Sequence, residues 1–203
     1  FYHRVGYELS QSKTTEKSSK AQSVTGENGK TILKSAVSYT VGQDKLDNRA
    51  DPSEGSLIEL AQEVAGVGGD AQFYKVIASA AYYQPVLFNS YFFGVKGRVG
   101  QVSGLGEKVT QSQRFFLGGR SVRGFDSSGI GPRDLGSNAA VGGNTVMNGS
   151  FEVVSRAGIS KDLNMRWTVF SDFGSVWGTD YPGGVRGAND SSIRTSLGAG
   201  LLW

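Results

Sequence analysis

Apolar and polar side chains alternate along most of this chain, which is the period-two pattern of β-strands with one apolar face. Residues 91–102, YFFGVKGRVGQV, show it clearly, with aromatic and valine side chains on one face and glycine or a cation on the other. The same alternation, strong or weak, recurs in seven further segments, at 1–10, about 31–41, 55–64, 73–84, 147–154, 165–177 and 192–203. The chain therefore predicts about eight strands and no convincing helix.

Charged side chains fall on the polar face of these strands. The members of this group are Lys96, Arg98, Glu152, Asp172 and Arg194. The core of a soluble sandwich could not bury such charges unpaired, whereas the wet lumen of a membrane barrel can hold them. The pattern favours a transmembrane barrel with its apolar face outward, and a soluble β-sandwich or barrel stays open as the alternative.

The lengths of the links between strands point the same way. Three long links, at 11–30, about 103–143 and 178–191, all fall on the same end of an up-and-down meander. Outer-membrane barrels combine short turns at one end with long loops at the other. We therefore predict an all-β fold, namely an antiparallel up-and-down transmembrane β-barrel.

Composition removes several classes of chemistry. The chain has no cysteine, which excludes disulfides and thiolate sites, and its single histidine, His3, leaves a catalytic triad or a histidine metal site without material. A net charge of +3 from 21 basic and 18 acidic residues gives no reason to expect nucleic acid as a partner. The 30 glycines lie outside any strand–loop–helix unit, so they do not predict a nucleotide site.

One long link carries a specific motif. The segment SVRGF at 121–125, with RFFLGG before it and GIGPRD after it, resembles the sixth extracellular loop of the BamA family of outer-membrane β-barrel assembly proteins. Four other segments are similar to the family in the same order: KLDNRADPSEG at 45–55 to a periplasmic turn, AVGGN at 140–144 to the start of the twelfth strand, and FSDFGSVW at 170–177 and SIRTSLGAGLLW at 192–203 to the thirteenth and fourteenth strands. The resemblance covers nearly the whole chain.

The resemblance implies a role for the loop motif, Val122, Arg123, Gly124 and Phe125. In this family the loop folds back into the barrel, where its arginine meets acidic residues on inward faces. The matching acids are Glu152 and Asp172, both of which the alternation already turns inward. Arginine suits this task because its planar, permanently charged fork can bond two carboxylates at once. Gly124 is expected to let the backbone turn closely, and Phe125 to wedge against the inner wall.

The resemblance also implies an activity. Members of the family fold and insert β-barrel proteins into the outer membrane of Gram-negative bacteria, without cofactor, metal or covalent catalysis. Their partners are unfolded outer-membrane protein clients, BAM-type lipoproteins and outer-membrane lipid. We therefore expect residues 1–203 to be part of one sixteen-stranded barrel domain, about its seventh to fourteenth strands, with the POTRA domains and the remaining strands absent. It follows that residues 1–10 should not pair with residues 192–203.

Three other interpretations stay open at this point. The first is a TamA-like factor or a two-partner-secretion transporter, which share the RGF loop within the same superfamily. The second is a complete eight-stranded barrel that acts as an anchor or adhesin. The third, a membrane-embedded hydrolase, is disfavoured because the chain lacks a histidine suited to catalysis.

Overall fold

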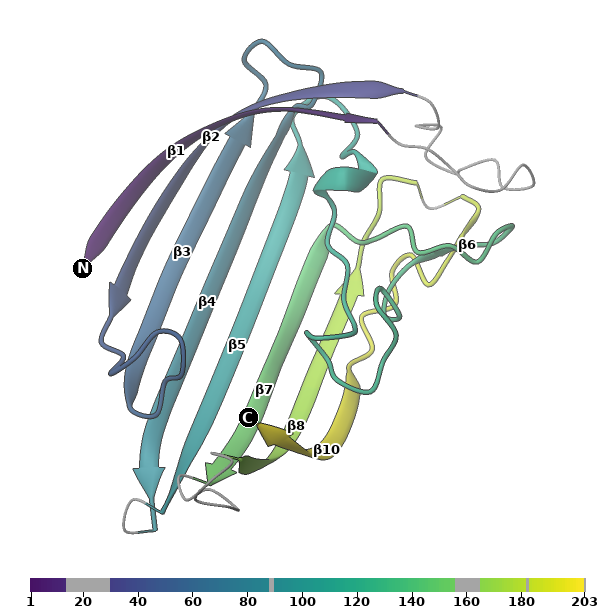
Figure 1. Ribbon diagram of the computed structural model, residues 1–203. Coiled ribbons are helices and arrows are strands. Elements are labelled where there is room, and N and C mark those ends of the chain that lie inside the picture. The colour runs from purple at the N-terminus through teal and green to yellow at the C-terminus, as the bar shows by residue number, and fades with distance from the viewer. Residues whose placement is uncertain (14–29, 88–89, 156–164, 182, 203) are drawn as a thin grey trace.

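The computed structural model describes residues 1–13, 30–87, 90–155, 165–181 and 183–202. Eight long strands form one antiparallel sheet in which each strand pairs with the next long strand along the chain. In order across the sheet they are β1 (Tyr2–Lys13), β2 (Thr31–Asp44), β3 (Gly55–Ala65), β4 (Phe73–Val86), β5 (Tyr91–Gly104), β7 (Thr145–Ser155), β8 (Arg166–Trp177) and β10 (Arg194–Leu202). The predicted all-β, up-and-down antiparallel fold is confirmed (Figure 1).

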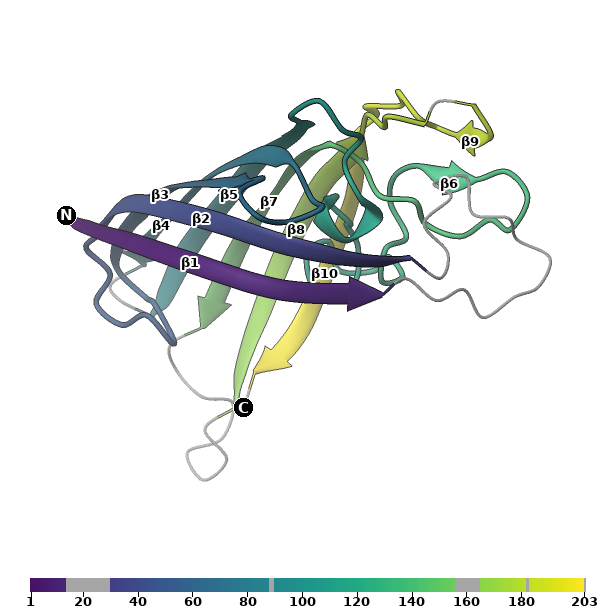
Figure 2. The ribbon, with the colours of Figure 1, turned by 90° about the horizontal axis from the view of Figure 1, so that it is seen from above.

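The sheet is a curved wall with two free edges. β1 and β10 stand at its two ends, and in the described ranges no backbone pairing joins them. Figure 2 shows the wall from above, with the two edge strands at its margins. The expectation that residues 1–10 would not pair with 192–203 is therefore confirmed, and the alternative of a closed eight-stranded barrel is inconsistent with this strand order. The total of sixteen strands stays a prediction, because the described residues form a sheet of eight strands.

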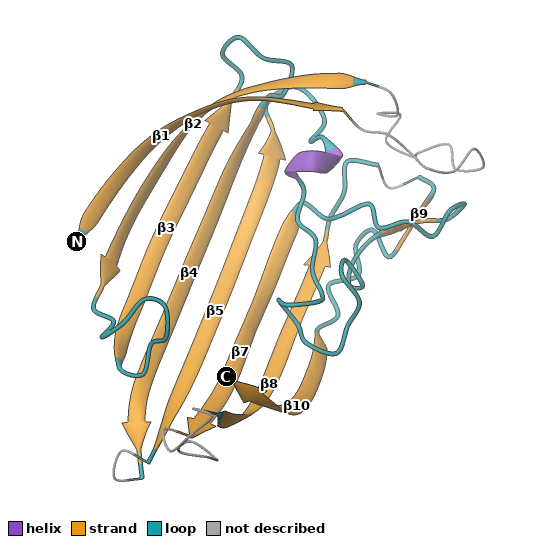
Figure 3. Ribbon diagram, viewed as in Figure 1, coloured by secondary structure: helices purple, strands orange, loops and turns teal. Residues whose placement is uncertain are grey.

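The predicted strands match the observed ones, with differences at their ends. AVGGN at 140–144 is not the start of a strand, because Gly142 has a φ of +75° and Gly143 bridges Phe115 in the preceding loop; β7 begins at Thr145. The sequence pattern also missed β6 (Arg133–Asp134), β9 (Val185–Arg186) and a 3₁₀ turn at Gln111–Gln113 (Figure 3). Elements of two or three residues are too short for a periodic signal. The predicted link 11–30 lies largely outside the described residues.

The two faces of the sheet differ in charge. Strand pairing puts the members of each cross-strand pair on the same face, so the registers and the alternation define both faces. Large exposed apolar side chains lie on the outer face: Val5, Tyr7, Leu9, Val37, Tyr39, Ile58, Leu60, Val64, Tyr82, Val99, Phe151, Val169, Leu197 and Leu201. The charges of the long strands lie on the inner face, except that of Lys13 at the end of β1. The predicted division of faces agrees with this arrangement. No helix of the described residues has the length and apolarity needed to cross a membrane.

The core lies between the inner face and the link that follows β5. Phe115, Leu117, Val122 and Ile130 of that link pack against sheet residues that include Phe73, Val102, Val146 and Val176. Two glycines of the wall make room for this packing. A Cβ atom on Gly174 would lie 2.6 Å from Leu117 Cδ2, and one on Gly100 would lie 2.9 Å from Phe115 Cζ. Small inward side chains therefore receive the large side chains of the loop.

Candidate functional site

Two links fold into one unit over the inner face of the sheet. We call residues 105–144, between β5 and β7, the inner loop. β6 in the inner loop pairs with β9 in the link between β8 and β10. Asp180 strengthens the connection, because its carboxylate accepts from the Val109 N–H at 2.8 Å and from Asn144 Nδ2 at 2.9 Å. Asp180 thus joins the two ends of the inner loop to each other and to the link between β8 and β10.

The tip of the inner loop has a closed backbone. The Gly119 N–H donates to the carbonyl of Phe125 at 2.9 Å, which joins the two sides of the VRGF turn. Gly124 adopts a φ of +88°, in the left-handed region where a side chain is strained. Val122 has no exposed surface and belongs to the core cluster. Arg123 lies between the buried Val122 and the turn at Gly124, and these two residues direct its side chain toward the inner face of the sheet.

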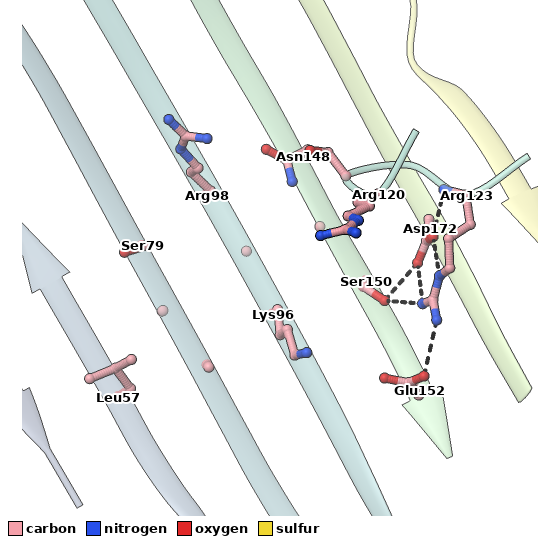
Figure 4. A pocket seen from close by; sticks show the side chains of 15 residues that line it. Leu57, Ser79, Lys96, Arg98, Arg120, Arg123, Asn148, Ser150, Glu152 and Asp172 are labelled. Atoms are coloured by element: carbon pink, nitrogen blue, oxygen red, sulfur yellow. Dashed lines mark hydrogen bonds and ion pairs between the residues drawn. The ribbon is translucent and has the colours of Figure 1, made fainter. Parts of the chain in front are cut away.

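Arg123 meets two carboxylates of the wall. Its Nε lies 2.7 Å from Asp172 Oδ2 and its Nη2 lies 2.8 Å from Asp172 Oδ1, a two-pronged contact with β8. Its Nη1 lies 3.0 Å from Glu152 Oε1 on β7. The Arg123 backbone N–H also donates to Asp172 Oδ2 at 2.9 Å. Figure 4 shows the guanidinium reaching down between the two acids.

Neighbouring side chains hold the acids in place. Ser150 donates to Asp172 Oδ1 at 2.7 Å and accepts from Arg123 Nη2 at 3.1 Å. Thr168 donates to Glu152 Oε1 at 2.8 Å. The guanidinium carbon lies 3.4 Å from the centroid of the Phe170 ring, the geometry of a cation–π contact. Each charged group is therefore satisfied by more than one partner.

Solvent reaches the members of this network unequally. The side chain of Asp172 is only 2% exposed, whereas that of Arg123 is 33% exposed. Breaking a fully buried ion pair costs about 3–5 kcal/mol, because one charge is left without a partner. The cost is smaller where water screens one member. Loss of the Arg123 side chain leaves Asp172 as a buried charge without an ionic partner, so Asp172 is the residue most dependent on the ion pair.

A cavity adjoins the network on the inner face. It encloses about 410 Å³ and is lined by residues that include Lys96, Arg98 and Asn148. Lys96 and Arg98 lie over the rings of Tyr83 and Phe115, at 5.7 and 5.6 Å from the ring centroids. In the part of the chain that the structure describes, no three histidine or carboxylate side chains gather as metal ligands would. The arrangement positions a loop by charge and packing.

The structure brings together the residues that the sequence singled out. Arg123, Glu152 and Asp172 are in direct contact, and Phe125 is half-buried beside the core cluster. What these contacts do for the protein stays a prediction. Sequence reasoning missed Phe170 as a partner of Arg123, although its even position in β8 puts it on the same face as Asp172. Alternation therefore placed Phe170 on the inner face, but an aromatic residue on a polar face does not by itself predict a cation–π contact.

A curved antiparallel wall, apolar outside and charged inside, with a long loop held against its inner face, defines a segment of a β-barrel with an internal loop. Residues 2–203 match the Omp85 superfamily domain, and the chain belongs to this superfamily. It is 35% identical over 202 residues to the outer membrane protein assembly factor BamA of Neorickettsia risticii, covering 98% of this chain and 27% of the relative. It is also similar to BamA of Neisseria meningitidis, with 30% identity over 167 residues that cover 78% of this chain and 21% of the relative.

A solved structure supports the same fold. The crystal structure of BamA from Haemophilus ducreyi lacking POTRA domains 1–3 superposes with a TM-score of 0.75 and 26% identity, over 87% of this chain and 38% of that chain. The chain spans only about a quarter of the length of the curated relatives described above, 27% and 21%. The similarity therefore concerns a barrel segment of much longer proteins.

Proposed function

We propose that this chain is the central barrel segment of an outer-membrane protein assembly factor of a Gram-negative bacterium, which folds β-barrel proteins and inserts them into the outer membrane. Its clients are unfolded outer-membrane proteins, and BAM-type lipoproteins and outer-membrane lipid are its other partners. The names of the relatives support this activity, and the superfamily membership supports the barrel. The chain acts as a folding scaffold and not as an enzyme, and it needs no cofactor.

The observation that carries the proposal is the contact of Arg123 with Asp172 and Glu152. It binds the tip of the inner loop to two adjacent strands, β7 and β8. In the whole barrel, the inner loop is extracellular in origin and folds into the lumen, where it stiffens this part of the wall. A stiff wall keeps its curvature while strand edges elsewhere in the barrel open to receive a client strand.

The apolar outer face fits a membrane location. An apolar face turned to lipid and a charged face turned to a lumen are the reverse of a soluble barrel, which hides its apolar side chains inside. The exposed belt includes Tyr7, Leu60, Phe151 and Leu197. Within the superfamily, a TamA-like factor would share these features, and the domains that precede this segment in the full-length protein distinguish the two.

The proposal is tested by replacing Arg123 in the full-length protein, reconstituted with its lipoprotein partners in liposomes. We expect Arg123→Ala to slow the folding of an added client barrel, measured as the appearance of its heat-resistant form on gels. Arg120→Ala is the matched control, because Arg120 is an exposed cation of the same loop three residues away. Client folding at the wild-type rate by correctly inserted Arg123→Ala protein would overturn the role of the contact.

A further inference from the structure

The outer face of the sheet has a groove at its centre. Small side chains of β4 and β5, Ala78, Ala80 and Gly97, form its floor. Larger apolar side chains stand on both sides; they are Ile58 and Leu60 on β3, Val99 on β5, Met147 on β7 and Phe173 on β8. The groove is open to the outside and has a volume of about 460 Å³. It lies on the face opposite to the inner loop and is separate from the Arg123 network.

The groove arises because small residues are aligned across neighbouring strands. Ala80 pairs with Gly97, and Gly97 pairs with Gly149, so three successive strands carry little or no side chain at one level of the outer face. A Cβ atom on Gly97 would meet nothing within 4 Å, so the floor there is open. Gly149 differs, because the ring of Phe173 covers it: a Cβ atom there would lie 2.4 Å from Phe173 Cζ.

The position of the groove matters for what can fill it. Ala80 lies near the middle of β4 and Gly97 near the middle of β5, so the groove stands at half the height of the wall. The side chains that line it on the outer face are apolar, and the strand charges nearby, such as Arg98, belong to the inner face. In an outer-membrane barrel, the outer face at this height lies within the hydrocarbon of the bilayer.

We propose that this groove seats one fatty acyl chain of a membrane lipid. The proposal rests on the membrane location in the proposed function. A flat barrel surface touches an acyl chain on one side only, whereas this groove touches it from the floor and from both walls. In hydrocarbon there is no hydrophobic driving force for association, so added van der Waals contact decides which lipid positions are retained. An acyl chain fits because it is narrow, flexible and wholly apolar.

A protein segment is a poorer occupant at this height. A strand docked there would present unpaired backbone groups to lipid, which is costly in the bilayer core. The sheet beneath offers no free edge to satisfy them, because β4 and β5 are both paired on each side. A transmembrane helix with small residues is the remaining competitor, and the experiment below separates it from lipid.

The test uses the full-length protein in nanodiscs with a phospholipid that carries a diazirine halfway along one acyl chain. After irradiation, cross-linked residues are mapped by mass spectrometry. We expect adducts to concentrate on the groove walls, above all Met147 and Phe173, relative to exposed outer-face residues elsewhere such as Val5 and Leu197. Gly97→Leu should reduce the wall adducts severalfold, because the leucine side chain fills the floor and removes the contacts that retain the acyl chain. Ala80→Leu fills the same floor and serves as an independent variant.

Ala199→Leu is the matched control, because Ala199 is an exposed small residue of the outer face on β10 and lies outside the groove. Heat-modified migration on gels verifies that each variant is folded. Equal labelling over the whole outer face, unchanged by Gly97→Leu, would overturn the groove while leaving the membrane location intact. Absence of label from the entire outer face would instead contradict the proposed function. Preferential cross-linking of a diazirine placed at 97 to another protein in native membranes would also overturn the lipid assignment.

Discussion

Arg123 and Asp172 are joined by three hydrogen bonds, from the backbone N–H, Nε and Nη2 of the arginine, across a separation of 49 residues. The backbone bond is independent of the side chain, so part of the contact survives any substitution at 123 except proline. The side-chain bonds use the planar fork of the guanidinium, which a lysine ammonium cannot reproduce. The contact therefore fixes both the path of the loop tip and the identity of its cation.

The energetics of this pair can be measured by a double-mutant cycle. We expect Arg123→Ala to lower the free energy of unfolding by about 1–3 kcal/mol, less than for a fully buried pair because Arg123 is partly solvated. Asp172→Asn in the Arg123→Ala background should recover part of the loss, since it removes the stranded charge. Urea unfolding of the full-length protein in detergent micelles gives all four values. Strict additivity of the two single changes would contradict a direct coupling.

The division of faces is tested by labelling single cysteines. Residues 1–203 contain no cysteine, so a thiol introduced at 95 or 96 is the only one in this segment. We expect the cysteine that replaces Lys96 to react with a water-soluble maleimide in isolated outer membranes, because Lys96 lies on the charged inner face of the sheet. The cysteine that replaces Val95 should be protected, because Val95 lies on the apolar outer face of the sheet. The opposite result at the two positions would mean that the register of β5 is shifted by one residue.

The fit of Leu117 against Gly174 predicts a steric effect. Gly174→Val should displace the inner loop, since its added carbons overlap Leu117 and crowd the Met147 carbonyl, 3.1 Å from the first of them. Overpacking of this kind costs about 1–3 kcal/mol. Limited proteolysis within 105–144 reports the loss of loop docking, and Leu117→Ala in the same background should restore part of the protection. Gly97→Val is the control, as its Cβ meets open space. An unchanged digestion pattern for Gly174→Val would refute the predicted packing.

The turn between β2 and β3 should loosen in acid. Hydrogen bonds from the Ser53 hydroxyl and from the Ser53 and Glu54 N–H groups hold the pKa of Asp47 well below its usual range. A lowered folded-state pKa stabilises the turn above the unfolded pKa of about 3.9, and this contribution is lost as pH falls through the folded value. Hydrogen exchange at Ser53 and Glu54, corrected for the intrinsic rate, should therefore stay slow at neutral pH and rise only in strong acid.

An ion pair in the same turn provides a control for this experiment. Asp51 Oδ2 lies 2.8 Å from Arg166 Nη2, but the Asp51 side chain is 55% exposed. Exposed pairs contribute little, about 0–1 kcal/mol. We expect Arg166→Ala to leave exchange at Ser53 and Glu54 nearly unchanged, whereas Asp47→Ala should accelerate it at neutral pH. Similar exchange in Asp47→Ala and wild-type protein would show that other contacts hold the turn.

The two free edges predict the behaviour of the isolated segment. β1 and β10 each present an unpaired row of backbone groups along one side. In a membrane, such groups need partners from neighbouring strands. Residues 1–203 expressed alone should therefore aggregate, or should fail to give a heat-resistant band in detergent gels. A stable, heat-resistant monomer would mean that the edges close in a way not seen in this sheet.

Local pattern alone determined much of this fold. Strand positions, the two faces and the inward direction of Glu152 and Asp172 follow from alternation, because a side chain in a strand points to the side opposite its neighbours whatever the rest of the chain does. The resemblance of the VRGF segment to the sixth extracellular loop of the BamA family added the expectation that Arg123 would contact these acids. Neither source required knowledge of which strands pair in which register.

Tertiary structure decided the features that depend on distant segments. The register between β7 and β8 sets Ser150 opposite Asp172 and Glu152 opposite Phe170, and this places four contacts of Arg123 within one small area. The groove likewise exists only because Ala80, Gly97 and Gly149 align across three strands. Register and loop path arise from the summed packing and hydrogen bonding of segments far apart in sequence, so no window of the sequence contains them.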